Sequence, residues 1–195
     1  MKGSTENIKQ EEMTDELLVS KIVAKNDTHL FSLLYDRYAD KVYGKCLGFS
    51  KSPEEAQDMT HDVFVQLFVK LKTFKGKSKF STWLYAFTYN FCLNYVQRKL
   101  KKEQEKFTSL NEDFHGSSAE EPEVSDAKIF EMKVDKLSKA LELINPDDKA
   151  ILLMKYQDDF SIQDIILALD IGESAVKMRL KRAKSKLIEI YHSLN

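Results

Sequence analysis

Apolar residues recur along this chain at intervals of three and four, the period of helices that bury one side. The start at residue 52 is the clearest, because Ser52 supplies a cap, Pro53 suits the first helical position and Glu55 completes a capping box. No alternating strand pattern competes, so the predicted fold is all-α. The pattern and its capping signals predict helices at residues 14–25, 27–49, 53–73, 80–103, 127–143 and 145–157, followed by two more before residue 190.

A polar segment interrupts this pattern at residues 107–126. It carries six carboxylates and no lysine or arginine, together with Gly116 and Pro122. Such a composition is typical of a flexible acidic linker. We therefore expect two small helical domains, and the predicted division of the chain is an N-terminal tail (1–13), an N-terminal domain (14–106), the linker (107–126) and a C-terminal domain (127–195).

The last two helices resemble a helix-turn-helix. A short helix with Ile162, Ile165 and Leu169 on its buried side leads through a turn that includes Asp170, Ile171 and Gly172 into a helix rich in lysine and arginine. On a helical wheel the buried stripe of the second helix is Val176, Leu180, Ala183, Leu187 and Ile190. The outward residues are Ser174, Met178, Lys181, Arg182 and Ser185, with Lys177, Lys184 and Lys186 on the flanks.

This arrangement predicts binding to double-stranded DNA. Lysine and arginine would contact phosphates, and residues in the first turns of the second helix, such as Ser174, would reach base edges in the major groove. A cationic, solvated surface helix is the plainer alternative. A helix-turn-helix alone also fits a stand-alone regulator of the LuxR type. The sequence of the N-terminal domain is therefore needed to distinguish between classes of DNA-binding protein.

Residues 160–187 are similar to the promoter-reading helix-turn-helix of sigma-70 family RNA polymerase initiation factors of the extracytoplasmic-function type. Asp170 stands where the family often has glycine, and aspartate tolerates a left-handed turn better than most residues. On this resemblance Lys177, Met178, Lys181 and Arg182 read the upstream, minus-thirty-five promoter element. The matching residues are Ile165, Leu169, Ile171, Val176, Lys177, Arg179, Leu180, Arg182, Ala183 and Leu187.

The helix that begins at Pro53 has an unusual outward face. Its predicted buried face comprises Ala56, Met59, Thr60, Val63, Phe64, Leu67, Leu71 and Phe74. The opposite face combines Asp58, His61 and Asp62 with Val65 and Val69. Carboxylates beside exposed valines suit a protein–protein surface. A polar face with two tolerated valines is the alternative, and a metal site is disfavoured because no other cluster supplies the missing ligands.

The sequence EEAQDMTHDVFVQLF in this helix looks like the most characteristic motif of the same sigma family, which grips the coiled coil of the polymerase clamp. Asp58, His61, Asp62, Phe64 and Val65 match its positions in order. The resemblance implies that these residues bind core RNA polymerase. His61 stands where the family usually has glutamine, so a hydrogen bond at the interface differs there.

Downstream, three lysines and a glycine precede an aromatic-rich helix. Lys75, Lys77 and Lys79 flank Gly76, and such a mixture of cations and aromatic rings suits unstacked, single-stranded nucleic acid. Core spacing is predicted for Phe80, Leu84, Phe87 and Phe91, and outward positions for Tyr85, Tyr89, Asn90, Asn94 and Tyr95. The segment resembles the family's minus-ten-element region, which implies a flipped base in the loop. The DNA-binding residues expected here are Lys75, Lys77, Lys79, Trp83, Asn90, Arg98 and Lys99.

The remaining features limit the possible function classes. The polar N-terminus and the lack of an apolar run near ~18 residues predict a cytoplasmic protein without membrane insertion. Cys46 and Cys92 are expected to be buried, reduced thiols. We expect no cofactor, no metal and no enzymatic activity; a phosphohydrolase using His61 and Asp62 is a rival from another class.

Taken with the resemblance, these features predict a sigma factor. It would bind core RNA polymerase and promoter DNA and would direct the initiation of transcription. The family resemblance also implies an anti-sigma factor as a candidate partner.

Overall fold

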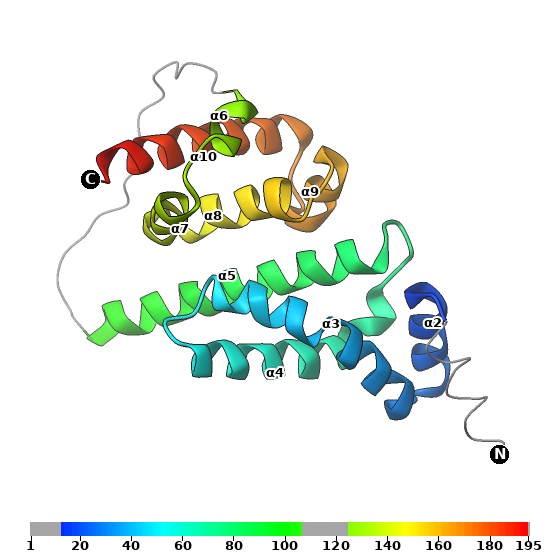
Figure 1. The fold of residues 1–195 in the computed structure, drawn as a ribbon. Coiled ribbons are helices and arrows are strands. Elements are labelled where there is room, and N and C mark those ends of the chain that lie inside the picture. Colours follow the sequence, from blue (N-terminus) through cyan, green and yellow to red (C-terminus); the bar gives the residue numbers. More distant parts are fainter. Residues whose placement is uncertain (1–12, 107–124, 195) are drawn as a thin grey trace. The chain divides into compact units, whose positions relative to one another are not determined.

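The computed structural model describes residues 13–106 and 125–194 (Figure 1). Within these ranges the chain is helical and contains no strand, as the sequence predicted. The chain divides into two compact units, Met1–Cys92 and Leu93–Asn195. Their division falls within one continuous helix, α5, and the predicted domain boundary at residue 106 stays a prediction.

The first unit is built from helices that begin where capping residues allow. Thr14, Asp27 and Ser52 each accept a hydrogen bond from a backbone N–H in the first turn that follows. Glu55 also accepts a hydrogen bond from the Lys51 N–H, at 2.6 Å. The helices are α2 (Asp15–Lys25), α3 (Thr28–Leu47), α4 (Pro53–Lys70), a short 3-10 turn η1 (Leu71–Thr73) and the first part of α5 (Phe80–Lys106), up to Cys92.

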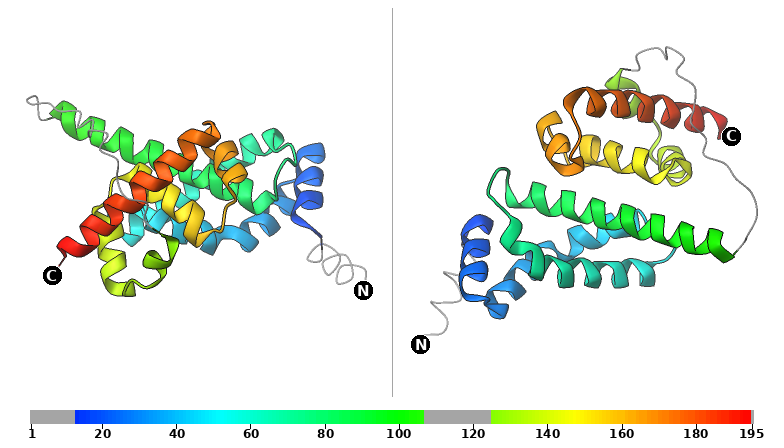
Figure 2. Two further views of the ribbon diagram at one scale, coloured as in Figure 1. Left: turned by 90° about the horizontal axis from the view of Figure 1, so that it is seen from above. Right: turned by 180° about the vertical axis from the view of Figure 1, so that it is seen from behind.

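Apolar side chains of these helices meet in one core. α3 and α4 pack against each other along their length, while α2 packs against α3 and η1. Figure 2 shows α3, α4 and α5 as a bundle of long helices with the short α2 at one end. Leu34, Met59 and Leu84 are fully buried representatives from the three long helices. Cys46 and Cys92 are also fully buried, as predicted, and carry free thiols with their sulfurs 4.0 Å apart.

The C-terminal helices form a second core around α10. Their order is α6 (Asp126–Phe130), α7 (Val134–Leu143), α8 (Pro146–Leu152), a π-helical turn η2 (Leu153–Gln157), α9 (Ile162–Leu169) and α10 (Glu173–Ser193). α10 packs against α7, α8 and α9. Asn145 caps α8, and Ser161 and Asp164 form a reciprocal capping box at the start of α9.

The helix predicted at residues 127–143 is wrong in one respect, because the structure divides it into α6 and α7. The break has a tertiary cause. The Lys133 backbone is extended (ψ 130°), and its N–H donates to the Tyr191 hydroxyl of α10 at 3.1 Å. A long-range hydrogen bond therefore replaces the local helical one.

The helix α6 begins at the last residue of the predicted linker. Ser125 and Asp126 are the N-cap and the first residue of α6. The Asp126 carboxylate accepts a hydrogen bond from the Tyr156 hydroxyl at 2.7 Å and pairs with Lys184 at 2.8 Å. The pKa of Asp126 lies below its ordinary value because Lys184 and Tyr156 both donate to the carboxylate. Residues 107–124 lie outside the described residues.

Candidate functional surfaces

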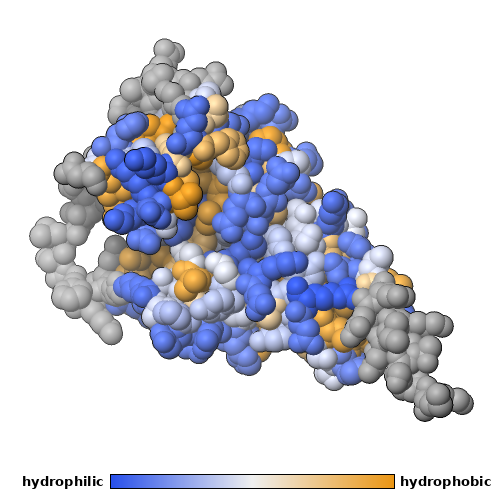
Figure 3. Space-filling model, in the orientation of Figure 1, coloured by the Kyte–Doolittle hydropathy of each residue, from blue (hydrophilic) through white to orange (hydrophobic). Residues whose placement is uncertain are grey.

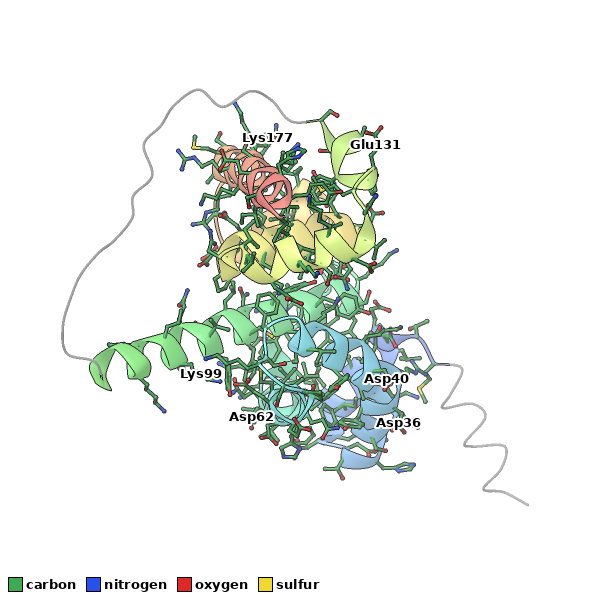
Figure 4. All side chains as sticks on the ribbon, turned by 60° about the vertical axis from the view of Figure 1, so that its left-hand side comes forward. Asp36, Asp40, Asp62, Lys99, Glu131 and Lys177 are labelled. Atoms are coloured by element: carbon green, nitrogen blue, oxygen red, sulfur yellow. The ribbon has the colours of Figure 1, made fainter. Side chains whose placement is uncertain are left out.

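The outward face of α4 has the composition that the sequence predicted. Asp58, His61 and Asp62 are exposed. Val65 and Val69 are 54% and 60% exposed, although the opposite side of the helix is well buried. Figure 4 shows Asp62 on the outside of the helical bundle. The face therefore presents two aliphatic side chains beside carboxylates.

Phe64 is not available to a partner on this face. It is 3% exposed, and its ring lies 6.3 Å from that of Phe31 and 4.6 Å from that of Tyr35. Periodicity placed it in the core and the family resemblance placed it at the polymerase. Its burial bears out the periodicity, so Phe64 supports the surface from below, and its part in polymerase binding stays a prediction.

Tyr35 of α3 packs against Phe64, the sequence neighbour of Val65. The two rings meet where α3 contacts α4, yet Tyr35 remains 41% exposed. An aromatic ring that is fixed on one side and exposed on the other is a common anchor in protein interfaces. A helical wheel of α4 cannot reveal Tyr35, because this residue comes from a different helix. We name the set Tyr35, Asp58, His61, Asp62, Val65 and Val69 the acidic ridge.

A hollow of about 280 Å³ adjoins the end of the acidic ridge. Val69 forms part of its wall, together with residues of α2 and η1. The other lining residues are Ile22, Val23, Asn26, Phe68, Leu71 and Lys72. The ridge thus ends beside a recess that is large enough for one or two partner side chains.

The lysine loop between η1 and α5 is also exposed. Lys75, Lys77 and Lys79 point into solvent, and Gly76 has a φ of +67°. Residues that carry a Cβ rarely adopt this backbone region, so glycine suits the turn. Three cations around a glycine turn make a compact site for the phosphates of a nucleic acid strand.

Trp83 belongs to an aromatic cluster at the start of α5. Its ring stacks on Phe87 at 5.9 Å and lies 5.4 Å from Phe74 and 5.9 Å from Phe80. Phe80 is fully buried, whereas Trp83 and Phe87 are half-buried. The cluster fixes the loop ends and leaves part of the indole accessible beside the lysines.

Tyr89 corrects another expectation. It was predicted to face outward, but it is fully buried, with its ring 6.1 Å from that of Phe49. The Lys45 ammonium lies 4.0 Å from the Tyr85 ring centre and 5.3 Å from that of Tyr89. α5 is therefore covered on two sides, and its aromatic residues serve mainly the core.

The remaining expected contacts of α5 differ in exposure. Asn90 is half-buried, Asn94 and Arg98 are exposed, and the ammonium of the half-buried Lys99 lies 6.0 Å from the Tyr95 ring centre. Figure 4 shows Lys99 on α5. Arg98 is thus the more accessible cation of the pair for contact with a phosphate.

The helix-turn-helix forms as predicted from α9 and α10. Asp170 adopts the left-handed conformation (φ 52°), and Ile171 is half-buried between the helices. Val176, Leu180, Ala183 and Leu187 are buried along α10. The five residues expected to contact DNA from α10 are all exposed, namely Ser174, Lys177, Met178, Lys181 and Arg182.

The lysines of α10 fall into two groups. Lys184 pairs with Asp126 of α6, and Lys186 pairs with Asp148 of α8, each at 2.8 Å. These two lysines therefore connect α10 to neighbouring helices of the same group. Lys177 pairs locally, with Glu173 at 2.6 Å in the same helix. Figure 4 shows Lys177 on the outer side of α10. Lys177, Lys181 and Arg182, all exposed, are named the exposed cationic face, and Arg179 beside them is exposed as well.

Ser185 was predicted to point outward and is instead 8% exposed. Within the part of the chain that the structure describes, its hydroxyl has no hydrogen-bond partner. A helical wheel gives the direction of a side chain but not what covers it, and a side chain as short as serine is easily covered. Ser185 is therefore no part of the exposed cationic face.

The C-terminal helices carry an apolar groove of about 310 Å³ between α6, α7, α8 and α10. Phe130 and Val134 at its rim are 73% and 79% exposed. Its lining residues are Ile129, Phe130, Met132, Val134, Leu137, Leu141, Leu152, Leu153, Tyr156, Gln157 and Leu187. Hydrophobic surface is visible among hydrophilic residues on these helices in Figure 3.

No set of three or more His, Cys, Asp or Glu side chains converges on a common point within residues 13–106 and 125–194. His61 and Asp62 therefore lack, among these residues, the further ligands that a metal-dependent phosphohydrolase needs. Over the same ranges, no helix is both long enough and apolar enough to span a lipid bilayer.

Comparison with known families matches both halves of the chain. Residues 34–102 match the family described as Sigma-70 region 2, and residues 135–187 match Sigma-70, region 4. The first match covers α4, the lysine loop and most of α5, and the second covers the helix-turn-helix. A stand-alone regulator of the LuxR type would leave the first match unexplained and is not favoured.

Curated relatives extend over nearly the whole chain. The ECF RNA polymerase sigma factor SigW of Bacillus subtilis is 29% identical over 175 residues, covering 86% of this chain and 91% of that protein. The ECF RNA polymerase sigma-E factor of Escherichia coli K12 is 25% identical over 181 residues, covering 91% and 94%. Order and spacing of the two regions are thus shared with proteins of similar length.

Solved structures share the fold. The sigma factor RpoE, in complex with the anti-sigma factor NepR from Bartonella quintana, has a TM-score of 0.60 at 16% identity and covers 85% of this chain and 98% of that chain. CnrH, in complex with the cytosolic domain of CnrY, has a TM-score of 0.61 at 15% identity, with coverage of 93% and 99%. With both sigma regions in order and matched relatives along its length, the chain belongs to the sigma-70 family of RNA polymerase sigma factors, in its extracytoplasmic-function branch.

Proposed function

We propose that this chain binds core RNA polymerase through the acidic ridge and directs it to promoters through two DNA-binding surfaces. The observation that carries this proposal is the succession of region 2 and region 4 matches along one chain. The ridge, the lysine loop and the exposed cationic face of α10 supply a separate surface for each task. The chain has no reaction of its own and acts in the cytoplasm, where its polymerase works.

The acidic ridge suits a partner helix with basic and aliphatic side chains. Asp58 and Asp62 are four residues apart and lie on the same side of α4, so they present their charges as a pair. Tyr35, Val65 and Val69 add apolar area beside that pair. Charges of this kind steer association, while buried aromatic and aliphatic contacts supply most of the affinity.

The two DNA surfaces act on different parts of a promoter. Lys177, Lys181 and Arg182 contact duplex phosphates, while Ser174 and Met178 approach base edges of the upstream element. The lysine loop and Trp83, with Asn90, Arg98 and Lys99 along α5, bind the opened strand of the downstream element. Because polymerase holds both surfaces at once, two weak contacts combine into a strong one.

An anti-sigma factor is a further partner in this proposal. Its support is that the sigma factor RpoE, which shares this fold, was solved with the anti-sigma factor NepR, and that CnrH, of the same fold, was solved with the cytosolic domain of CnrY. Such a protein would act by covering surfaces that polymerase needs. Competition between the antagonist and core polymerase for the purified chain would test it.

A reconstituted transcription reaction tests the main proposal. Purified chain and core polymerase are expected to co-elute at low salt and to produce new transcripts from genomic templates. Duplex promoter DNA alone should bind the chain weakly. Sequence-specific binding of equal strength with and without polymerase would instead support a stand-alone regulator.

Tyr35→Ala is expected to lower the affinity for core polymerase about ten-fold, since truncation of a central interface aromatic residue commonly costs more than about 1 kcal/mol. Fluorescence titration of labelled core polymerase measures the effect. Tyr43→Ala on the same helix is the matched control, because Tyr43 lies outside the ridge and is half-buried. Tyr35→Phe should bind almost normally. Equal losses for Tyr35→Ala and Tyr43→Ala would argue against Tyr35 as an anchor.

A further inference from the structure

Two adjacent carboxylates at the start of α2 reach different helices. Asp15 pairs with Arg37 of α3 at 2.8 Å and accepts a hydrogen bond from the Tyr38 hydroxyl. Glu16 accepts a hydrogen bond from the Phe80 backbone N–H at 3.1 Å, across 64 positions of sequence. α2 is therefore tied by Asp15 to α3 and by Glu16 to the beginning of α5.

The contact made by Glu16 satisfies a need that α5 cannot meet locally. Phe80 is the first residue of α5, and the first N–H groups of a helix lack partners within the helix. Lys79 precedes it, and a lysine side chain has no acceptor atom. A carboxylate from α2 supplies the acceptor and also places negative charge at the positive end of the helix dipole.

Phe80 is also the point where the lysine loop ends. At the loop's other end, the Phe74 ring packs 5.5 Å from Phe80 and 5.4 Å from Trp83. The buried Phe80 ring lies 5.6 Å from that of Tyr38, the residue that Asp15 holds. The two carboxylates of α2 thus fix the backbone and the ring of the residue at which the loop ends.

We infer that Glu16 is a positioning residue for promoter opening, which holds the lysine loop of residues 75–79 in the geometry that accepts the unpaired strand. The inference rests on the role proposed above for the loop. Glu16 itself touches no DNA. Its loss would free the start of α5 to unwind, so that Lys79 and Trp83 no longer keep a fixed spacing.

Glu16→Ala, Glu16→Gln and the control Glu189→Ala test this inference in reconstituted holoenzyme. Glu189 is an exposed glutamate of α10 to which the described residues make no hydrogen bond. Three quantities are measured: the affinity for core polymerase, the affinity for duplex carrying the upstream element, and strand opening by a fluorescent base analogue in the downstream element.

Glu16→Ala is expected to reduce the equilibrium extent of opening about five-fold, the effect of losing one helix cap. Polymerase affinity and upstream-element affinity should change less than about two-fold. Glu16→Gln keeps an oxygen acceptor and should restore most of the opening, and Glu189→Ala should match the unaltered protein. The loss in Glu16→Ala should also depend on the base placed at the flipped position, which a loss of folded protein would not produce.

Normal opening by Glu16→Ala would overturn the inference. It would equally be overturned if opening, polymerase affinity and thermal stability all fell in parallel, because Glu16 would then only maintain the fold. Failure of the proposed function has a different signature, since the unaltered protein would then open no promoter in the presence of polymerase.

Discussion

Changing both Asp58 and Asp62 to lysine is expected to weaken binding to core polymerase at least about 100-fold. Each substitution removes an attractive charge and adds a repulsive one, and opposed like charges at an interface cost several kcal/mol. Both side chains are exposed on α4, so their replacement leaves the buried face of that helix unchanged. The effect should appear mainly as slower association and should shrink as salt is added.

Asp36 and Asp40 on α3 provide a matched control. They lie four residues apart, as Asp58 and Asp62 do, and belong to the same group of helices (Figure 4). Their conversion to lysine changes the net charge by the same amount but leaves the ridge intact. Equal loss of polymerase binding in both double variants would show that binding depends only on the net charge of the chain, contrary to the proposal.

Thermal unfolding separates this effect from misfolding. The double ridge variant should retain its melting temperature within a few degrees, because surface substitutions away from caps and buried partners usually change stability by less than about 0.5 kcal/mol. It should also retain binding of the C-terminal helix-turn-helix to DNA. A milder pair, Asp58→Asn with Asp62→Asn, removes the charges with less disturbance. If this pair folds and binds polymerase as tightly as the unaltered protein, the charges of the ridge have no part in binding.

The helices themselves were readable from sequence because local rules and the buried faces agree. The period of α4 placed Val63 inside and Val65 outside, and both positions are confirmed. The capping signal at Ser52 located the start of α4 to the residue. Where capping residues and apolar periodicity agreed with the buried face of a helix, the tertiary packing kept the helix that they predicted.

Residues that depend on a second packing partner were not readable in this way. Tyr89 lies outward on a wheel of α5 alone, yet Phe49 and Lys45 cover it. The break between α6 and α7 follows from the hydroxyl of Tyr191, which lies 58 residues from its donor Lys133. A wheel describes one helix, whereas burial depends on everything packed around that helix.

The same distinction applies to the candidate sites. Asp58, Asp62, Lys181 and Arg182 are exposed side chains on regular helices, and periodicity alone places them. Tyr35 acquires its role from its contact with Phe64, and Glu16 from its hydrogen bond with Phe80. Neither contact can be predicted from a local sequence pattern. At Phe64 periodicity and family resemblance disagreed, and periodicity was right about burial because large aromatic residues in register with a core stripe are seldom exposed.

Replacing both Lys181 and Arg182 by alanine is expected to lower the affinity of holoenzyme for a promoter with an upstream element about 10- to 100-fold. The two side chains are exposed on α10, and each lost base or phosphate contact costs on the order of 1 kcal/mol or more. Alanine favours helix, so α10 itself should persist. Because phosphate contacts do not read the base sequence, promoters with a scrambled upstream element should lose affinity by a similar factor.

The salt dependence gives a second, independent readout. Each phosphate contact releases counterions and contributes about 0.9 to the slope of log affinity against log salt concentration. If both residues contact phosphates, the slope should fall by about 1.8 relative to unaltered holoenzyme. Polymerase contributes its own slope, but that contribution is common to both samples and cancels in the difference.

Lys184→Ala with Lys186→Ala removes the same charge from the same helix and is the matched control. These lysines pair with Asp126 and Asp148 of the scaffold, so they are engaged away from the exposed cationic face. This variant should lose thermal stability through its broken ion pairs while keeping most of its upstream-element affinity and its salt slope. Equal losses of promoter affinity and equal falls in the salt slope for the two double variants would show that only the total positive charge of α10 matters. Lys181 and Arg182 would then have no specific role in promoter recognition.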